Sequence, residues 1–220
     1  MRIVIAGGHG KIALHLERLL AQRGDTPVGL VRNPDHTEDV RATGAEAELL
    51  DLENATVTQV AEKLMGADAA VFAAGAGPGS GAARKETVDR DAAIRMADAA
   101  ALAGVNRYVV VSAIGVDEGP APDAEPVWAA YVAAKRDADA DIRGRELDTG
   151  WTILRPGRLT DDAGTGRVRL APRAERGEVP RQDVAAVIAA LLDEPATIGH
   201  VLDLVGGSTP VADAVASVTS

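Results

Sequence analysis

The chain contains no cysteine. This absence excludes disulfide bonds, thiolate catalysis and every metal site with cysteine ligands, and it suits the reducing interior of a cell. The spacing of the four histidines is not that of metal ligands. The four are His9, His15, His36 and His200. We therefore predict no bound metal and a cytoplasmic location.

Aromatic residues and net positive charge are also scarce. Phe, Trp and Tyr make up 2% of the 220 residues, and the net charge is -10. Because such a surface repels nucleic-acid phosphates and anionic lipids, we predict neither as a partner. No stretch reaches the roughly 18 apolar residues that cross a bilayer, and no signal-peptide pattern opens the chain, so no membrane association is expected.

The sequence does contain a regular alternation of short apolar runs and segments with helical periodicity. The apolar runs predict strands at 2–6, 27–31, 46–50, 69–74, 105–111, 151–155 and 200–204. The periodic segments predict helices at 11–23, 36–43, 55–65, 84–103, 126–147 and 181–192. Such alternation implies crossover connections and predicts an α/β fold. We expect a Rossmann-type doubly wound parallel sheet flanked by helices, in a single domain over 1–220.

Residues 157–180 differ from the rest because they are rich in Gly, Pro, Arg and Asp and show little periodicity. We expect them to form a small, loop-rich C-terminal flap. Ligands of open α/β folds bind at the carboxyl edge of the sheet. The flap is therefore predicted to lie on the substrate side of the site.

A glycine turn follows the first strand directly and opens the first helix. Its spacing is G-x-x-G-x-x-A, through Gly7, Gly10 and Ala13. Glycine permits the sharp reversal, and N–H groups at a helix N-terminus face a pyrophosphate readily. The spacing departs from G-x-G-x-x-G, although alanine can replace the third glycine. We predict nucleotide binding, with His9 or Lys11 adding positive charge, against the alternative of a purely structural turn.

The end of the second strand indicates which dinucleotide binds. The run VGLV leads into Arg32 and Asn33, with no carboxylate before Asp35. An NAD site expects an acidic residue about 20 positions after the turn, whereas a guanidinium suits a 2'-phosphate. The sequence favours NADP over NAD, with a solvated strand-end arginine as the alternative.

The pentapeptide YVAAK supplies candidate catalytic residues. Tyr131 and Lys135 lie one helical turn apart on the same face, where the ammonium is expected to lower the pKa of the tyrosine. Ser112 follows a predicted strand, and its hydroxyl could bond a substrate carbonyl, or it could simply cap the strand. We predict Ser112, Tyr131 and Lys135 as the catalytic group. The acidic run 137–148 is expected on the solvated face of this helix.

These motifs together resemble the short-chain dehydrogenase/reductase superfamily, in particular its atypical NmrA-like and epimerase/dehydratase-like NAD(P)-binding branch. The resemblance covers nearly the whole chain and rests on IAGGHGKIA, LVRNP, DLEN, VFAAGAG, ALAGVNRYVVVSAIG, YVAAK and TGWTILRPGRLT.

The resemblance implies which residues contact the cofactor. In the glycine turn they are Gly7, Gly8, His9, Gly10, Lys11 and Ile12. Arg32 would meet the 2'-phosphate. The residues bordering the adenine or passing beneath the cofactor would be Asp51, Leu52, Ala73, Ala74 and Gly75. The residues at the nicotinamide end would be Ser112, Lys135, Pro156 and Gly157.

The predicted function is that of an NADP-dependent oxidoreductase of the short-chain type, which transfers a hydride to or from a small carbonyl or hydroxyl substrate. The same residues suit epimerase or dehydratase chemistry through transient oxidation. The alternative is a non-enzymatic NADP-binding redox sensor or regulator of the NmrA-like type. We expect a monomer or a homodimer.

Overall fold

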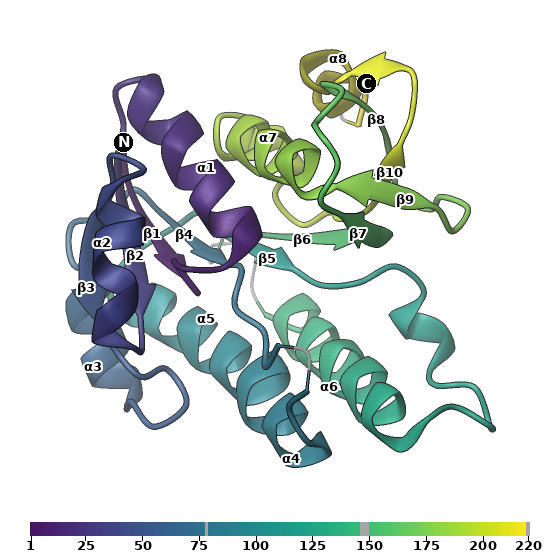
Figure 1. Ribbon diagram of the computed structural model, residues 1–220, viewed down its shortest axis with the longest axis horizontal. Helices are drawn as coiled ribbons and strands as arrows, with labels where there is room; N and C mark the ends of the chain where they lie inside the picture. Colours follow the sequence, from purple (N-terminus) through teal and green to yellow (C-terminus); the bar gives the residue numbers. More distant parts are fainter. Residues whose placement is uncertain (78, 146–149, 219–220) are drawn as a thin grey trace.

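A computed structural model describes residues 1–77, 79–145 and 150–218. Its main sheet has the strand order β11-β8-β10-β6-β5-β4-β1-β2-β3 (Figure 1). The bounds of these strands, in chain order, are β1 Arg2–Ala6, β2 Thr26–Val31, β3 Glu46–Leu49, β4 Ala69–Phe72, β5 Tyr108–Val111, β6 Trp151–Pro156, β8 Arg167–Ala171, β10 Val201–Gly206 and β11 Thr209–Pro210. The strands from β3 to β10 in this order pair in parallel. This arrangement confirms the predicted Rossmann-type fold.

Helices cover both faces of the sheet, as Figure 1 shows. The helices on one face are α1 Lys11–Gln22, α7 Arg181–Leu192 and α8 Val211–Ser217. The helices on the other are α3 Val57–Leu64, α5 Ala93–Leu102 and α6 Pro126–Arg143. Successive strand residues point to opposite faces, so Ile3 and Ile5 pack under α1 and α7 whereas Val4 packs toward α3 and α5. Near β3, η1 Pro34–His36 leads into α2 Thr37–Arg41.

The segment predicted as one helix over 84–103 is divided into three parts. A short α4, Ala82–Arg84, leads into the π-helix η2, Lys85–Ala92, which continues as α5. The wider turns of a π-helix occur frequently at functional sites. In η2 two charged side chains, Lys85 and Asp89, are buried.

Helix α6 ends at Arg143, and residues 146–147 of the predicted helix lie outside the described residues. Asp137 and Asp141 are exposed, as expected of the acidic run 137–148. The expectation is wrong for Asp139, which is 1% exposed. Asp139 lies on the face of α6 that packs against the sheet, where the guanidinium of Arg155 donates a hydrogen bond to its carboxylate at 2.8 Å. Residues 146–148 of the run lie outside the described residues.

The predicted flap, residues 157–180, contains three short strands joined by loops. The strands β7, Arg158–Thr160, and β9, Glu178–Pro180, pair in parallel as a small separate sheet. Between them β8 joins the main sheet antiparallel to β10. This return carries the loop after β8 back over the sheet toward η3, Val116–Glu118.

Among the described residues, no helix combines the length and the apolar character that crossing a bilayer requires.

Candidate functional site

A cleft of about 590 Å³ opens at the carboxyl ends of β1, β2 and β4. Many of the residues predicted to contact a cofactor line it, namely Gly7, His9, Gly10, Lys11, Arg32, Asp51, Leu52, Ala73, Ala74 and Gly75. Residues that the sequence reasoning missed line it as well, and they include Asn33, His36, Glu53, Gly77, Arg84 and Val88. The predicted adenosine and pyrophosphate residues are therefore neighbours in space.

The glycine turn forms the floor of the cleft. Gly7 has φ +79°, and a Cβ there would lie 2.7 Å from the Cα of Ala74. Gly8 is packed equally tightly, because its Cβ would lie 2.7 Å from the Cα of Gly29 on β2. Gly10 precedes α1 without a side-chain cap, so the first N–H groups of this helix have no side-chain acceptor there. These features fit a pyrophosphate. Ile12, in the first turn of α1, is buried and does not line the cleft.

Two guanidinium groups meet at the adenosine end of the cleft. Arg32 lies 3.4 Å and Arg84 3.0 Å from the Oε2 atom of Glu53. Thr87 donates to Glu53 Oε1 at 2.6 Å, and this bond, followed by the Arg84 interactions, holds the pKa of Glu53 below its usual value. The ionised carboxylate of Glu53 thus pairs with both arginines and holds their guanidinium groups at the cleft.

The basic side chains of the glycine turn, His9 and Lys11, already have partners in the protein. The rings of His9 and His36 stack with their centroids 3.7 Å apart, and His9 Nε2 lies 2.8 Å from Asp39. Lys11 pairs with Asp161, which also accepts from Arg181. A phosphate binding at Lys11 would therefore compete with the Asp161 carboxylate.

Lys135 is buried where α6, β5 and η2 meet. Its Nζ donates to the carbonyl of Val111 at 3.0 Å and lies 3.5 Å from Asp89 Oδ1. Asp89 Oδ2 in turn accepts from the backbone N–H of Ala76 at 3.2 Å, in the loop after β4. The ammonium is therefore fixed beside the strand end that precedes Ser112.

Tyr131 lies in the same region, half-buried, on α6. Its ring is 5.2 Å from that of Trp128, and the Nζ of Lys85 lies over it at 5.5 Å. Burial raises the pKa of Tyr131, and the charges of Asp89 and Asp139 raise it further. The expected lowering of this pKa is wrong for this structure, because the ammonium of Lys135 is engaged by the Asp89 carboxylate.

Ser112 and Asp139 complete this cluster. The Oγ of Ser112 and the Oδ1 of Asp139 are buried atoms for which the described residues provide no hydrogen-bond partner of good geometry. Burial raises the pKa of Asp139, while Arg155 and the Ser112 hydroxyl lower it in part. The cluster therefore places the Ser112 hydroxyl beside a buried carboxylate.

The predicted nicotinamide-end residues lie outside the cleft lining described above. Pro156 accepts from Ile114 N at 3.0 Å, and Gly157 donates to Leu204 O at 2.8 Å. Ser112 N donates to Leu154 O at 2.8 Å, which fixes the Ser112 backbone beside β6. The described residues contain no group of three or more histidine or acidic side chains arranged to hold a metal ion.

The strand order, the glycine turn and the cleft define a dinucleotide-binding α/β protein. Residues 7–195 match the model of a family described as NAD(P)H-binding, and the chain belongs to this family.

Relatives of known name agree with this assignment. A Bacillus subtilis protein named as an uncharacterized sugar epimerase, YhfK, is 35% identical, and the match covers 98% of this chain and 99% of the relative. A Bacillus halodurans protein, provisionally named an NAD-dependent epimerase/dehydratase, has a solved structure with TM-score 0.89 and 33% identity, over 99% and 100% of the two chains. An oxidoreductase from Lactococcus lactis has TM-score 0.84 and 26% identity, over 99% and 96%. These matches confirm the resemblance to epimerase/dehydratase-like NAD(P)-binding proteins.

Proposed function

We propose that the protein is an NADP-dependent oxidoreductase of the short-chain type, acting on a small carbonyl or hydroxyl compound. The observation that carries the proposal is that Tyr131 and Lys135, from α6, and Ser112, which follows β5, are linked through two buried carboxylates. Asp89 pairs with Lys135, and Asp139 lies beside Ser112. Both carboxylates raise the pKa of Tyr131.

The preference for NADP rests on the adenosine end of the cleft. Arg32 and Arg84 offer planar donor groups that match a phosphate, and no carboxylate follows β2 directly. Glu53 positions both guanidinium groups through its ion pairs with them. A 2'-phosphate would gain charge-assisted hydrogen bonds there that a 2'-hydroxyl could not form.

Each catalytic residue has a role that follows from its surroundings. The bound nicotinamide would supply or accept a hydride. The hydroxyl of Ser112 would bond and orient the substrate oxygen, and Tyr131 would exchange a proton with it. An ammonium has three donors, and after bonding Val111 and Asp89 that of Lys135 keeps one for a ribose hydroxyl. The same groups would support epimerisation or dehydration, the activities named for the relatives.

The test compares Tyr131→Phe with Tyr108→Phe as a matched control. Tyr108 is fully buried in the core and donates to Ala93 O, and it has no role in the proposed reaction. NADPH affinity is measured by fluorescence titration, and turnover by NADPH oxidation with a panel of carbonyl compounds. We expect Tyr131→Phe to bind NADPH normally and lose roughly 100-fold or more in turnover. Full turnover by Tyr131→Phe contradicts the assigned role.

A second candidate function, an NADP-binding redox sensor without turnover, is favoured by one observation. The pKa of Tyr131 is raised, so this tyrosine stays protonated near neutral pH and is a weaker proton donor than an ordinary tyrosine. This function predicts that no carbonyl compound is turned over and that a partner protein binds only one redox form. Absence of saturable NADPH and NADH binding would contradict both functions.

A further inference from the structure

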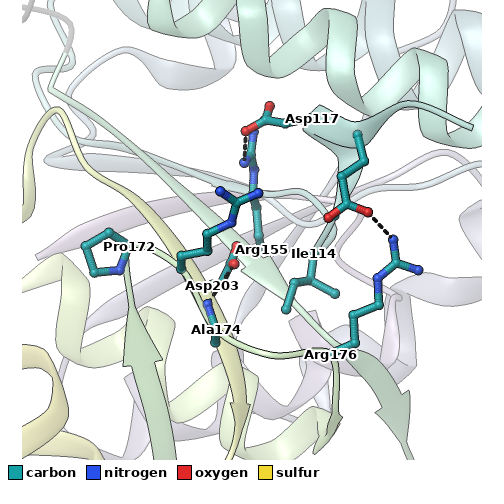
Figure 2. A pocket seen from close by; sticks show the side chains of 10 residues that line it. Ile114, Asp117, Arg155, Pro172, Ala174, Arg176 and Asp203 are labelled. Atoms are coloured by element: carbon teal, nitrogen blue, oxygen red, sulfur yellow. Dashed lines mark hydrogen bonds and ion pairs between the residues drawn. The ribbon is translucent and has the colours of Figure 1, made fainter.

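A second cavity, of about 320 Å³, lies on the α6 side of the sheet, where the loops after β5 and β8 approach β6 and β10. Figure 2 shows its lining. The lining residues are Ile114, Gly115, Asp117, Glu118, Arg155, Pro172, Arg173, Ala174, Arg176 and Asp203. None of them lines the cleft described above. The charged members make this a site for a polar ligand, since an apolar group would remove their hydration without replacing it.

The cavity adjoins the candidate catalytic cluster. Arg155, which lines the cavity, donates to Asp139 Oδ2 at 2.8 Å. The other oxygen of Asp139, Oδ1, and the Oγ of Ser112 are the two buried atoms of the cluster described above. Ile114 follows Ser112 by two residues and donates to Pro156 O at 3.0 Å. The cavity therefore lies beside the loop that follows Ser112.

Each carboxylate of the cavity accepts at least one hydrogen bond from a protein group. Asp117 accepts two bonds from Arg155, at 2.7 and 2.8 Å, as Figure 2 shows in part. Glu118 accepts from Arg176 at 2.7 Å. Asp203 accepts from the N–H of Ala174 at 3.1 Å. Each of these three carboxylates therefore already has a donor in the protein.

The cations are satisfied with one exception. Arg155 and Arg176 have the partners just given, whereas Arg173 forms no hydrogen bond or ion pair with another described residue. Arg173 is exposed at the cavity, and its charge acts on the pKa values of Asp117 and Asp203 from a longer distance. Among the described residues that line the cavity, Arg173 is thus the cation whose guanidinium has all its donors available.

We infer that this cavity binds the part of the substrate remote from the reacting carbonyl, and that this part carries a carboxylate or phosphate that pairs with Arg173. The inference rests on the proposed oxidoreductase function. A guanidinium binds either oxyanion through two parallel N–H donors. The volume corresponds to roughly ten water molecules, which suits a small anionic group with hydroxyl neighbours rather than a large ring system.

The experiment uses straight-chain oxo acids of increasing carbonyl-to-carboxylate separation, each paired with its uncharged methyl ester, and also inorganic phosphate. Binding is measured by ligand-observed NMR, with and without NADPH. Arg173→Gln is compared with Arg169→Gln, because Arg169 is exposed on β8 and does not line the cavity. We expect at least one acid to bind about tenfold tighter than its ester, and Arg173→Gln alone to abolish this preference.

Several outcomes decide the inference. Equal binding of acids and esters, an unchanged preference in Arg173→Gln, or no binding of any acid or of phosphate at millimolar concentration would each overturn it. Competition by inorganic phosphate against the acid shows that a phosphate group uses the same donors, and its absence assigns the site to carboxylates. Failure of the proposed function appears separately, as loss of NADPH binding or of Tyr131-dependent turnover, while the acid preference of the NADPH-free protein persists.

Discussion

The Nζ of Lys135 lies 3.5 Å from Asp89 Oδ1, and both side chains are almost completely buried. This ion pair joins α6 to the π-helix η2. Through the bond from Ala76 N to Asp89 it also reaches the loop after β4, whose residues line the cofactor cleft. The candidate catalytic group and the cleft are therefore connected by one buried carboxylate.

Asp89→Asn should destabilise the fold and lower the pKa of Tyr131. The ammonium of Lys135 would lose its counter-ion in a buried setting, which costs about 3 kcal/mol. The Tyr131 pKa should fall because the Asp89 charge raises it. Denaturant unfolding and ultraviolet absorbance titration measure the two effects. Asp91→Asn is the control, since Asp91 pairs with Arg90 nearer the surface. An unshifted tyrosine titration in Asp89→Asn would contradict this account.

Arg32→Ala should weaken NADPH binding about tenfold or more and leave NADH binding nearly unchanged, because only NADPH carries the 2'-phosphate. Arg84→Ala should act in the same direction, since both groups share Glu53. Fluorescence titration with each cofactor gives the ratio. Arg41→Ala, on the exposed surface of α2, controls for a general loss of positive charge. Equal losses for NADPH and NADH would refute the role of Arg32.

Gly7→Ala should lose cofactor binding and stability, and Gly24→Ala separates the two causes. Both glycines have positive φ, which costs an alanine roughly 1 kcal/mol or more. Only Gly7 also meets a neighbour, since its Cβ would lie 2.7 Å from Ala74 Cα, whereas Gly24 has nothing within 4 Å. Thermal unfolding and NADPH titration should show a clearly larger loss for Gly7→Ala. Similar losses in both variants would mean that the close approach to Ala74 is unimportant.

Glu17→Gln should flatten the dependence of stability on pH. Glu17 is fully buried under the glycine turn, and burial raises its pKa from 4.5 to about 8. Between these values the folded state binds more protons than the unfolded state, so this contribution is complete below pH 4.5 and is lost as the pH rises through about 8. The slope for this one group reaches at most about 1.4 kcal/mol per pH unit. Unfolding at several pH values, wild type minus variant, measures it. A difference that does not change with pH would contradict the raised pKa.

The parts of the site that the sequence predicts well are those fixed by local chemistry. The glycine turn, the loop after β4 and the strand-end Arg32 follow strand ends directly, and parallel strands bring such ends to one edge. Glu53 and Arg84 escape this reasoning because they come from different connections and meet only after the chain has folded. The motif DLEN contains Glu53, but nothing local indicates that it would hold two arginines.

The electrostatics of the catalytic cluster could not be predicted from spacing. The spacing of YVAAK places Tyr131 and Lys135 on one face, yet the pKa of Tyr131 depends on Asp89, which comes from a distant π-helix. In the sequence, Asp139 is one of several acidic residues in a run that is predicted to face solvent. Its burial is explained by the hydrogen bond from Arg155 on β6, a contact that forms only in the folded chain. Strand β8 is equally obscure in the sequence, because RVRLA alternates charged and apolar residues in a segment rich in turn formers.

The cleft is lined by residues between 7 and 88, and the second cavity by residues between 114 and 203. The two sets share no residue, although the predicted nicotinamide-end residues also lie in the later half. If the proposed function holds, substitutions among the residues that line the second cavity should alter which compound is accepted and leave the contacts at the adenosine end intact. Recombining the first half of one relative with the second half of another, at the connection before β5, keeps each set of lining residues together, provided that the Asp89–Lys135 pair and the pairing of β4 with β5 are preserved.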